Sequence, residues 1–555
     1  MDNIPSYFSS IQFSNKHEDS KLPHYFVKLT EDQLDKFEVL NSMYLLENYS
    51  HLLFFLENQP NSKNLIVPPF DIVIVLLTLA TVSNHYKEPV VRGNDPYNVS
   101  RQQLSKRALA LLRKYLKILR EFDCENFERY NLELLRCQFF LAIDTLTLRK
   151  ARTTFERLKR RKTDESVIYT DITFDIDSED SRVDIIRNPY RSYISALDQK
   201  QTVLGNTLLN IKLSQPGEFV NMLLWTLSNS LQKDAALYIS SHDIWIPLLE
   251  VILDLFGIRH EYFTNNEIKN NINVSEFVQR LSDSPLSILF KSIDSVRFTD
   301  RLCEYIFIKC ELKHDTTTYK TFLHPVYHNE NTIVKTFIPR TIFSENYKFK
   351  KSMALRRKFI GACFRLLIDV PTGRKLVSPR LIADDIIASV VQYLSKFEDI
   401  KQFKAFFFTD DLSQELYFIP LLAEMTLLEI SKDLVYDNKK GLGLVENMNN
   451  TDSFLKIILN IIDAGYFLPP KDHNGEELWS VYSLNMEKSD VCLLILIRYM
   501  KYLVDDDVSI SVGNTVDIFM KRIKELDKTR SDMNLNIANS IKLNLYDQIK
   551  LILEV

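Results

Sequence analysis

Glycine is scarce in this sequence. Only 11 of its 555 residues are glycine, about a quarter to a third of the usual share. Folds that turn from a strand into a helix around a phosphate need glycine at set positions. No GxxxxGK motif occurs, and Gly441-Leu442-Gly443 is followed by Glu446 where a dinucleotide-binding loop needs its third glycine. The shortage argues against a nucleotide-binding α/β fold.

Short motifs of hydrolytic and metal-dependent enzymes are also missing. The sequence contains no HExxH, no CxxC and no GxSxG. One candidate zinc site remains, made of Cys303, Cys310, His314, His324 and His328. It lacks the close pair of ligands that starts known zinc modules. Cys303 and Cys310 are one heptad apart, as two core residues on one helix stripe would be, so we expect no metal here.

Two other candidates for chemistry also have structural explanations. Asp384 and Asp385 are expected on a solvated helix face rather than in a catalytic pair. Trp225 and Trp245 are expected as core anchors rather than as parts of a ligand site. The sequence therefore predicts a protein that is not an enzyme and that carries no cofactor.

Cysteine is rare, and long apolar runs are absent. The start, MDNIPSYFSSIQF, has no basic segment followed by an apolar core, so we expect no signal peptide. The most apolar run, Ile72 to Ala80, is too short to cross a bilayer. We expect a soluble intracellular protein without membrane contact. Its cysteines are expected as reduced, buried thiols because they fall at irregular spacings in apolar stretches: Cys124, Cys137, Cys303, Cys310, Cys363 and Cys492.

What the sequence does have is length, balanced charge and helical apolar patterns. Its 555 residues exceed one compact core and fit two to four domains. The net charge of −4 provides no overall basic field of the kind that marks a nucleic-acid coat protein. Thr30-Glu31-Asp32-Gln33 has the form of a capping box, which predicts that a helix begins there.

Apolar residues recur at helical spacing over most of the chain. Ser241 is expected to cap a helix over 242–256 and Gly257 to end it. Two helices are expected within 275–310 and an irregular loop over 312–350. This pattern predicts an all-α, elongated multi-helix scaffold, with degenerate helical-repeat-like stacking left open as one arrangement. The other helices are expected at 70–84, 102–122, 126–149, 218–231, 353–369, 379–396, 412–432, 452–464, 487–504 and 514–553.

The expected organisation has five parts. A flexible tail over 1–23 precedes an N-terminal helical block over 24–149. A charged mobile loop over 150–187 follows, because no helical apolar stripe runs through its acidic part. A central helical block over 188–435 and a C-terminal helical block over 436–555 complete the chain.

The charged interval begins with a basic block. Residues 149–162, RKARTTFERLKRRK, hold eight basic residues and one acid, a net charge of +7. The block ends in four consecutive bases that suit a nuclear import signal or a phosphate contact: Lys159, Arg160, Arg161 and Lys162. A helix end with a solvated basic face is the alternative explanation.

An acidic block follows over 164–184, with eight acids and one base. It leads into Val183-Asp184-Ile185-Ile186. An extended apolar peptide beside acids can add as a strand to an exposed sheet edge. These four residues resemble a SUMO-interacting motif, in which aliphatic residues stand beside an acidic or phosphorylatable flank. The alternative is that they begin the next helix and pack inward. The acidic flank is Asp175, Asp177, Glu179 and Asp180.

Several long stretches, in order, resemble one yeast protein family, the fifth non-SMC element of the Smc five–six complex. The resemblance covers most of residues 24 to about 435 and thins toward the C-terminus. No single motif is diagnostic. The stretches are 24–57, 70–83, 94–101, 130–147, 188–199, 216–232 and 412–424, among them NDPYNVSR at 94–101 and LSQELYFIPLLAE at 412–424.

The resemblance implies an all-helical, non-catalytic subunit. Such a subunit pairs with the sixth non-SMC element and docks near the ATPase heads of Smc five and Smc six. The pair recruits or loads the complex on DNA, restrains its ATPase, and is linked to SUMO and its conjugating machinery. A nuclear, chromosome-associated protein that meets DNA mainly through the complex is therefore expected. The alternatives are a generic helical scaffold, or direct DNA binding through residues 149–162.

Overall fold

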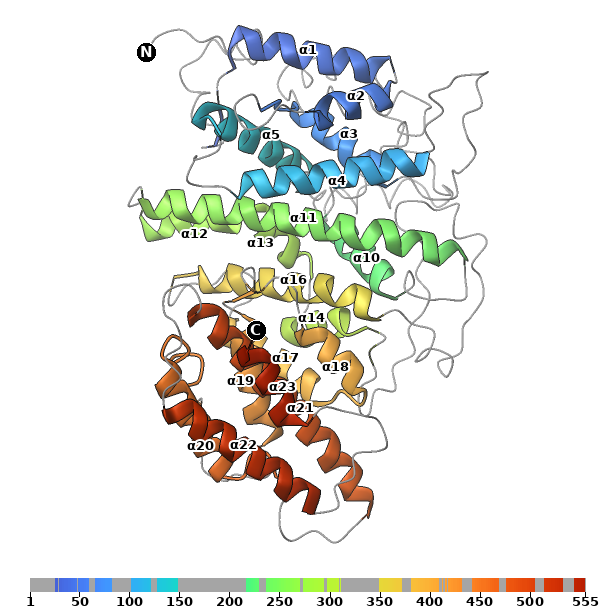
Figure 1. Ribbon diagram of the computed structural model, residues 1–555. Helices are drawn as coiled ribbons and strands as arrows, with labels where there is room; N and C mark the ends of the chain where they lie inside the picture. Colours follow the sequence, from blue (N-terminus) through green and yellow to red (C-terminus); the bar gives the residue numbers. More distant parts are fainter. Residues whose placement is uncertain are drawn as a thin grey trace, which may run out of the picture. The chain divides into compact units, whose positions relative to one another are not determined.

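Among the residues that it describes, the computed structural model contains eighteen helices and no β-strand (Figure 1). The predicted all-α fold is confirmed. The charged interval 150–187 and the block boundaries expected at 149, 187 and 435 lie outside the described residues, so they stay predictions. The described residues are 25–27, 29–46, 48–58, 65–81, 101–120, 127–147, 216–228, 236–269, 273–293, 297–308, 310, 349–371, 381–408, 412, 415–416, 418–431, 442–468, 476–504, 514–532 and 544–554.

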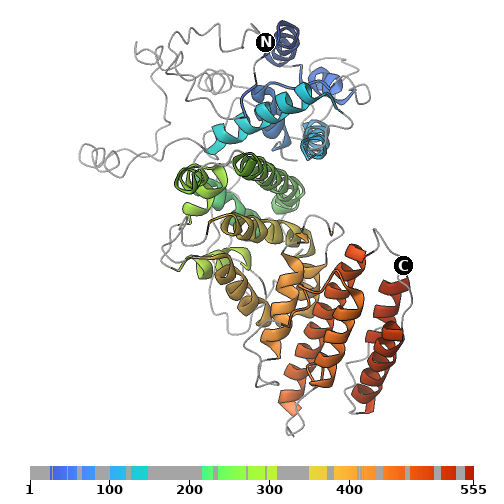
Figure 2. The ribbon, with the colours of Figure 1, turned by 90° about the vertical axis from the view of Figure 1, so that its left-hand side faces the viewer.

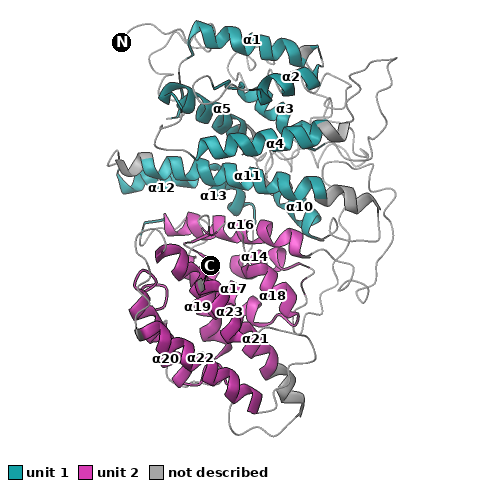
Figure 3. Ribbon diagram, viewed as in Figure 1, with its two compact units in different colours: residues 1–294, 320–346, 370–377 teal, residues 295–319, 347–369, 378–555 magenta. Residues whose placement is uncertain are grey.

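The chain folds as two compact units (Figure 3). Unit 1 comprises Met1–Asp294, Lys320–Asn346 and Val370–Val377. Unit 2 comprises Ser295–Tyr319, Tyr347–Asp369 and Ser378–Val555. Each unit has its own set of buried apolar residues, as a chain too long for one core requires.

Helix α3 (Phe70–Ala80) forms the centre of unit 1. Every one of its residues is buried, and nine of the eleven are apolar, so neighbouring helices must cover each of its faces. Helices α1 (Glu31–Leu45), α4 (Arg101–Leu119) and α5 (Arg129–Thr147) pack against it. The Ser105 hydroxyl of α4 donates to the Ala80 carbonyl at 2.9 Å. This bond gives a hydrogen-bond donor to a carbonyl oxygen that lacks an intrahelical partner at the end of α3.

The remaining helices of unit 1 complete this core. The sequence predicted two helices within 275–310. The structure places three there, and Pro285 opens one of them, where its missing N–H costs no hydrogen bond. The unit contains α2 (Tyr49–Glu57), α10 (Pro216–Ser228), α11 (Ala236–Lys269), α12 (Val274–Ser282) and α13 (Pro285–Lys291), and the third helix, α14 (Phe298–Ile306), belongs to unit 2.

Helix α11 corrects the prediction of a short helix over 242–256. It runs from Ala236 to Lys269, so Ser241 does not cap it and Gly257 does not end it. It even contains Pro247 in its interior. Glycine inside a helix costs about 1 kcal/mol relative to alanine, a small term beside the burial of the apolar residues on both sides of Gly257. Tertiary packing therefore overrides the local stop signal.

Unit 2 is a second helical assembly with an aromatic centre. The Phe307 ring lies 5.7 Å from the Tyr393 ring and 5.6 Å from the Phe406 ring. Figure 2 shows the orange and red helices of this unit lying side by side. With α14, they are α16 (Phe349–Ile368), α17 (Ala383–Ser395), α18 (Ile400–Phe407), α19 (Ile419–Ile430), α20 (Thr451–Asp463), α21 (Glu476–Val504), α22 (Asn514–Asp532) and α23 (Leu545–Glu554).

The helices of unit 2 differ from the sequence expectation in several places. Helix α18 lies where none was predicted, although Asp399 accepts from the Lys401 amide at 2.8 Å as its cap. Helix α21 begins at Glu476 rather than near 487. The interval 514–553 holds two separate helices, α22 and α23. Short helices and helix ends depend on the packing around them, which local periodicity does not contain.

Adjacent arginines of α16 join neighbouring helix ends in unit 2. Arg356 donates to the carbonyls of Ile306 and Ile308 at the end of α14. Arg357 donates to the Phe406 carbonyl of α18 at 2.6 Å and to Glu415 at 2.9 Å. A cation is favourable at a helix C-terminus, where carbonyl oxygens lack intrahelical partners. These contacts fix α14, α16 and α18 relative to one another.

Candidate interaction surface

The outer face of the α1–α2 hairpin is the candidate functional surface. Thr30 caps α1, with its hydroxyl accepting from the Gln33 amide at 3.4 Å. The Gln33 side chain does not complete the predicted capping box, because it donates to Asn131 of α5. Asn48 caps α2 by accepting from the His51 amide at 3.3 Å. The two caps define two short consecutive helices that contact each other.

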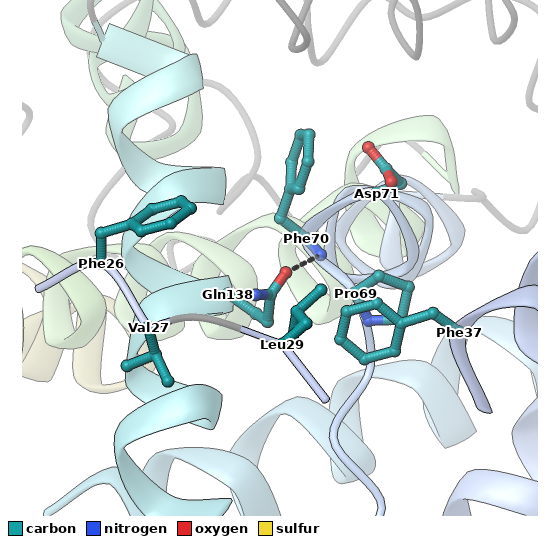
Figure 4. A pocket seen from close by; sticks show the side chains of 8 residues that line it. All are labelled: Phe26, Val27, Leu29, Phe37, Pro69, Phe70, Asp71 and Gln138. Atoms are coloured by element: carbon teal, nitrogen blue, oxygen red, sulfur yellow. Dashed lines mark hydrogen bonds between the residues drawn. The ribbon is translucent and has the colours of Figure 1, made fainter. Parts of the chain in front are cut away.

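The inner face of α1 is held against the core of unit 1 (Figure 4). Phe37 lies beside Pro69 and Phe70, and the Phe70 amide donates to the Gln138 side chain of α5 at 3.0 Å. The space between these side chains is about 10 Å³, enough for about one water molecule. This crevice is therefore packing beneath the hairpin and no ligand site.

A buried polar network holds the segment that leads into α1. The Tyr25 hydroxyl donates to Asp144 of α5, and the Arg259 guanidinium lies 4.6 Å from the centre of the Tyr25 ring. Arg259 also lies 3.5 Å from the Asp144 carboxylate. Burial raises the pKa of the Asp144 carboxyl, while attraction to Arg259 and the hydrogen bond from Tyr25 oppose that rise. The network joins the N-terminal segment to α5 and α11.

The outer face of the hairpin exposes large apolar side chains. Leu46 is 79% exposed and Phe54 is 61% exposed, with Val39 at 46% and Phe55 at 37%. Val39 lies on α1, and Leu46, seven residues later, is the residue that caps the end of this helix. These four residues are called the α1–α2 apolar surface below. Fully burying each such side chain would contribute about 1.5–3 kcal/mol.

Acidic residues lie on the same outer side of α1. Glu31, Asp32, Asp35 and Glu38 are all exposed, and Lys36 is the one exposed base among them. Lys36 pairs with Asp32 at 2.6 Å, which leaves three carboxylates without that pairing. The face is therefore acidic at its start and apolar toward α2. A basic, amphipathic helix of a partner has the complementary chemistry.

A second exposed apolar set lies in unit 2. Tyr502 of α21 is 38% exposed, Ile518 of α22 is 56% exposed and Leu551 of α23 is 53% exposed. Helix α23 packs against both α21 and α22. These residues are fewer than those of the α1–α2 apolar surface and lack phenylalanine, so they serve as the comparison surface in the tests below.

The predicted interaction motifs fall outside the described residues. This holds for the candidate SUMO-interacting residues Val183 to Ile186 and for their acidic flank, Asp175 to Asp180. It also holds for the four bases Lys159 to Lys162. The α1–α2 apolar surface was not predicted from the sequence, because Phe54 and Leu53 look alike in a pattern although one is exposed and the other buried.

Those candidates for catalytic or metal chemistry that lie among the described residues serve in packing or in helix capping. Cys303 and Cys310 are buried in unit 2, while His314, His324 and His328 lie outside the described residues. Asp385 accepts from the Ile382 amide at 3.0 Å at the start of α17. Trp225 and Trp245 are buried, as expected of core anchors. Across the described part of the chain, no cluster of histidine, cysteine and acidic residues could hold a metal ion.

The described cysteines agree with the expectation of buried thiols. Cys137, Cys303, Cys310, Cys363 and Cys492 are buried and unpaired with one another, as predicted for reduced thiols. Cys124 lies outside the described residues. No described helix combines the length and the apolar character that a bilayer crossing requires.

Comparison with known families decides what kind of scaffold this is. A family described as DNA repair proteins Nse5 and Nse6 matches residues 6–528. The chain belongs to the Nse5 family. A relative from Saccharomyces cerevisiae (strain ATCC 204508 / S288c), named "Non-structural maintenance of chromosome element 5", is 50% identical over 519 residues. The aligned region covers 93% of this chain and 93% of that relative. The resemblance seen in the sequence stretches is thereby confirmed.

Proposed function

We propose that this chain is a non-catalytic subunit of the Smc five–six chromosome-maintenance and DNA-repair complex. The observation that carries this proposal is the family match over nearly the whole chain. In the nucleus the subunit forms a heterodimer with the sixth non-SMC element. The pair docks near the heads of Smc five and Smc six, recruits or loads the complex on DNA, and restrains its ATPase.

The α1–α2 apolar surface is the proposed contact with the sixth non-SMC element. Two observations support it: four large apolar side chains are exposed on two consecutive helices and on the cap between them, and acids lie beside them on α1. Exposed apolar clusters with a polar rim are typical of protein-binding sites. The partner is expected to present a basic helix with aliphatic anchors.

Co-expression and pull-down with the sixth non-SMC element test this contact. Leu46→Ala/Phe54→Ala is expected to weaken binding at least tenfold, because truncating one central anchor typically costs about 2 kcal/mol. Its melting temperature should stay unchanged, since both side chains are largely exposed. Ile518→Ala/Leu551→Ala is the matched control in unit 2. Loss of binding in the control alone would move the interface to unit 2, and failure of the native chain to capture its partner would contradict the heterodimer.

The role within the larger complex has its own assays. Capture of Smc five and Smc six from nuclear extract by the tagged chain is expected, and their absence would contradict membership in the complex. Addition of the heterodimer to the purified complex is expected to lower ATP turnover in the absence of DNA. Unchanged turnover would remove ATPase restraint from the proposal and leave the scaffold role standing.

SUMO is the proposed ligand of residues Val183 to Ile186. Aliphatic residues beside four acids support this proposal, since such a peptide can pair with a sheet edge that has a basic rim. Changing Val183, Ile185 and Ile186 together to alanine is expected to abolish SUMO binding in a calorimetric titration. The melting temperature should not change. Unchanged SUMO affinity would reject this motif, and a collapsed fold would assign these residues to the core.

A further inference from the structure

One face of α4 carries four basic side chains and no acid. Lys106, Arg113, Lys114 and Lys117 are exposed, and Ala110 is the only other exposed residue described on this helix. The helix sequence RQQLSKRALALLRKYLKIL contains no aspartate or glutamate at any position. The four cations are called the α4 basic face below. Helix α4 runs along the front of unit 1 in Figure 1.

The spacing of these residues places them on one narrow strip. At about 100° per residue, all four point within an arc of about 100° of the helix circumference. With a rise of about 1.5 Å per residue, the strip from Lys106 to Lys117 is about 16 Å long. The opposite face of α4, with Leu112, Tyr115 and Leu119, is buried in unit 1. The fold therefore holds the cations in a fixed outward row.

The four cations of the α4 basic face differ in their ion pairing from Arg107 and Arg120 nearby. Arg107 binds Glu57 at 2.7 Å, and Arg120, next to the helix end, binds Asp254 at 3.2 Å. Some exposed cations elsewhere in unit 1 have acidic partners, namely Lys36 with Asp32 and Arg280 with Glu276, each at 2.6 Å. No ion pair or hydrogen bond joins the side chains of the α4 basic face to any described residue.

The four charges of the α4 basic face also repel one another. Arg113 and Lys117 are four residues apart, and Lys114 and Lys117 are three apart, which are the spacings at which helix side chains meet. Like charges at these spacings destabilise a helix. An anionic ligand that lies along the row would remove this repulsion. The face is thus suited to bind a linear polyanion.

We propose that the α4 basic face binds the phosphate backbone of duplex DNA without reading its sequence. The face exposes no aromatic side chain on which a single-stranded base could stack. It also exposes no large apolar residue that could anchor a peptide. A row of cations on a rigid element instead fits the evenly spaced charges of a duplex. The family's description as DNA repair proteins agrees with this ligand.

Salt dependence gives the size of the expected effect. Each phosphate contact contributes about 0.9 to the slope of log affinity against log salt concentration. Loss of four contacts lowers the slope by at most about 3.6, so doubling the salt would weaken the native protein up to about 12-fold more than the variant. This contact goes beyond the proposed heterodimer and does not depend on it.

The test uses the full-length chain and a fluorescent mixed-sequence DNA duplex in a salt titration. In the variant K106Q/R113Q/K114Q/K117Q, the slope and the affinity at low salt are expected to fall. The matched control, K36Q/R280Q/R301Q/R522Q, also removes four positive charges, but from exposed cations that have acidic partners. It should bind as the native chain does, unless total charge alone determines affinity. If the fourfold variant does not fold, K106Q/K117Q and R113Q/K114Q are each expected to lower the slope by about half as much.

Four results would overturn the proposal. One is an unchanged slope in the α4 variants that fold. Another is an equal loss in the control variant. A third is a loss produced only by changing Lys159, Arg160, Arg161 and Lys162 to glutamine, which would assign DNA contact to that basic block. The last is that the same four residues bind phosphatidylserine vesicles or polyglutamate more tightly than they bind the duplex.

Discussion

Removal of the Arg357 guanidinium should locally destabilise unit 2. This side chain is 4% exposed and joins α16 to Glu415 at 2.9 Å and to the Phe406 carbonyl at 2.6 Å. Arg357→Met keeps much of the volume but removes every donor. Removing one partner of a buried ion pair costs about 3–5 kcal/mol. The Phe406 carbonyl at the end of α18 also loses this donor, so we expect the free energy of local opening at α18 to fall by about 3 kcal/mol.

Hydrogen exchange read by mass spectrometry measures this effect on peptides that cover 400–408. A loss of about 3 kcal/mol accelerates exchange by about 100-fold or more. Arg301→Met is the control, because Arg301 and Glu304 are both about half exposed in their ion pair on α14. Exposed pairs contribute at most about 1 kcal/mol, so its effect should stay below about fivefold. Equal effects of the two substitutions would refute the role assigned to the buried arginine.

Two further expectations concern glycine and cysteine. Gly257→Ala should stabilise unit 1 by about 0.4–1 kcal/mol in calorimetry, because the residue lies within α11 and an added Cβ meets nothing within 4 Å. Gly465→Ala has the same open space but a φ of +86°, so it should instead destabilise unit 2 by about 1–2 kcal/mol, and the same sign for both would contradict this reasoning. Burial raises the pKa of the Cys137 thiol to about 12, so iodoacetamide at pH 8 should modify this residue only after denaturation. Rapid labelling of the native chain, read by mass spectrometry, would show that α5 is open.

Local sequence signals predicted the parts of the fold that depend on neighbouring residues. Thr30 begins α1 as predicted, because an N-cap needs only a hydroxyl and an amide three residues on. The helix expected over 70–84 is present as α3, and its largely apolar sequence explains why all of it is buried. The prediction that Gly257 ends a helix was wrong, because the tendency of one glycine to end a helix is weaker than the packing of α11 on its neighbours.

The sequence by itself determined an all-α chain with the stretches of the Nse5 family, since helical periodicity and residue order are local properties. Only the tertiary structure decided which charged side chains are buried and which gain a partner. Arg356 and Arg357 stand beside Lys358 in one basic run, yet the two arginines are buried at helix ends that arrive from distant parts of the chain. Whether a cation gains a partner depends on which acid or carbonyl folding brings within a few ångströms, and no local pattern contains that distance.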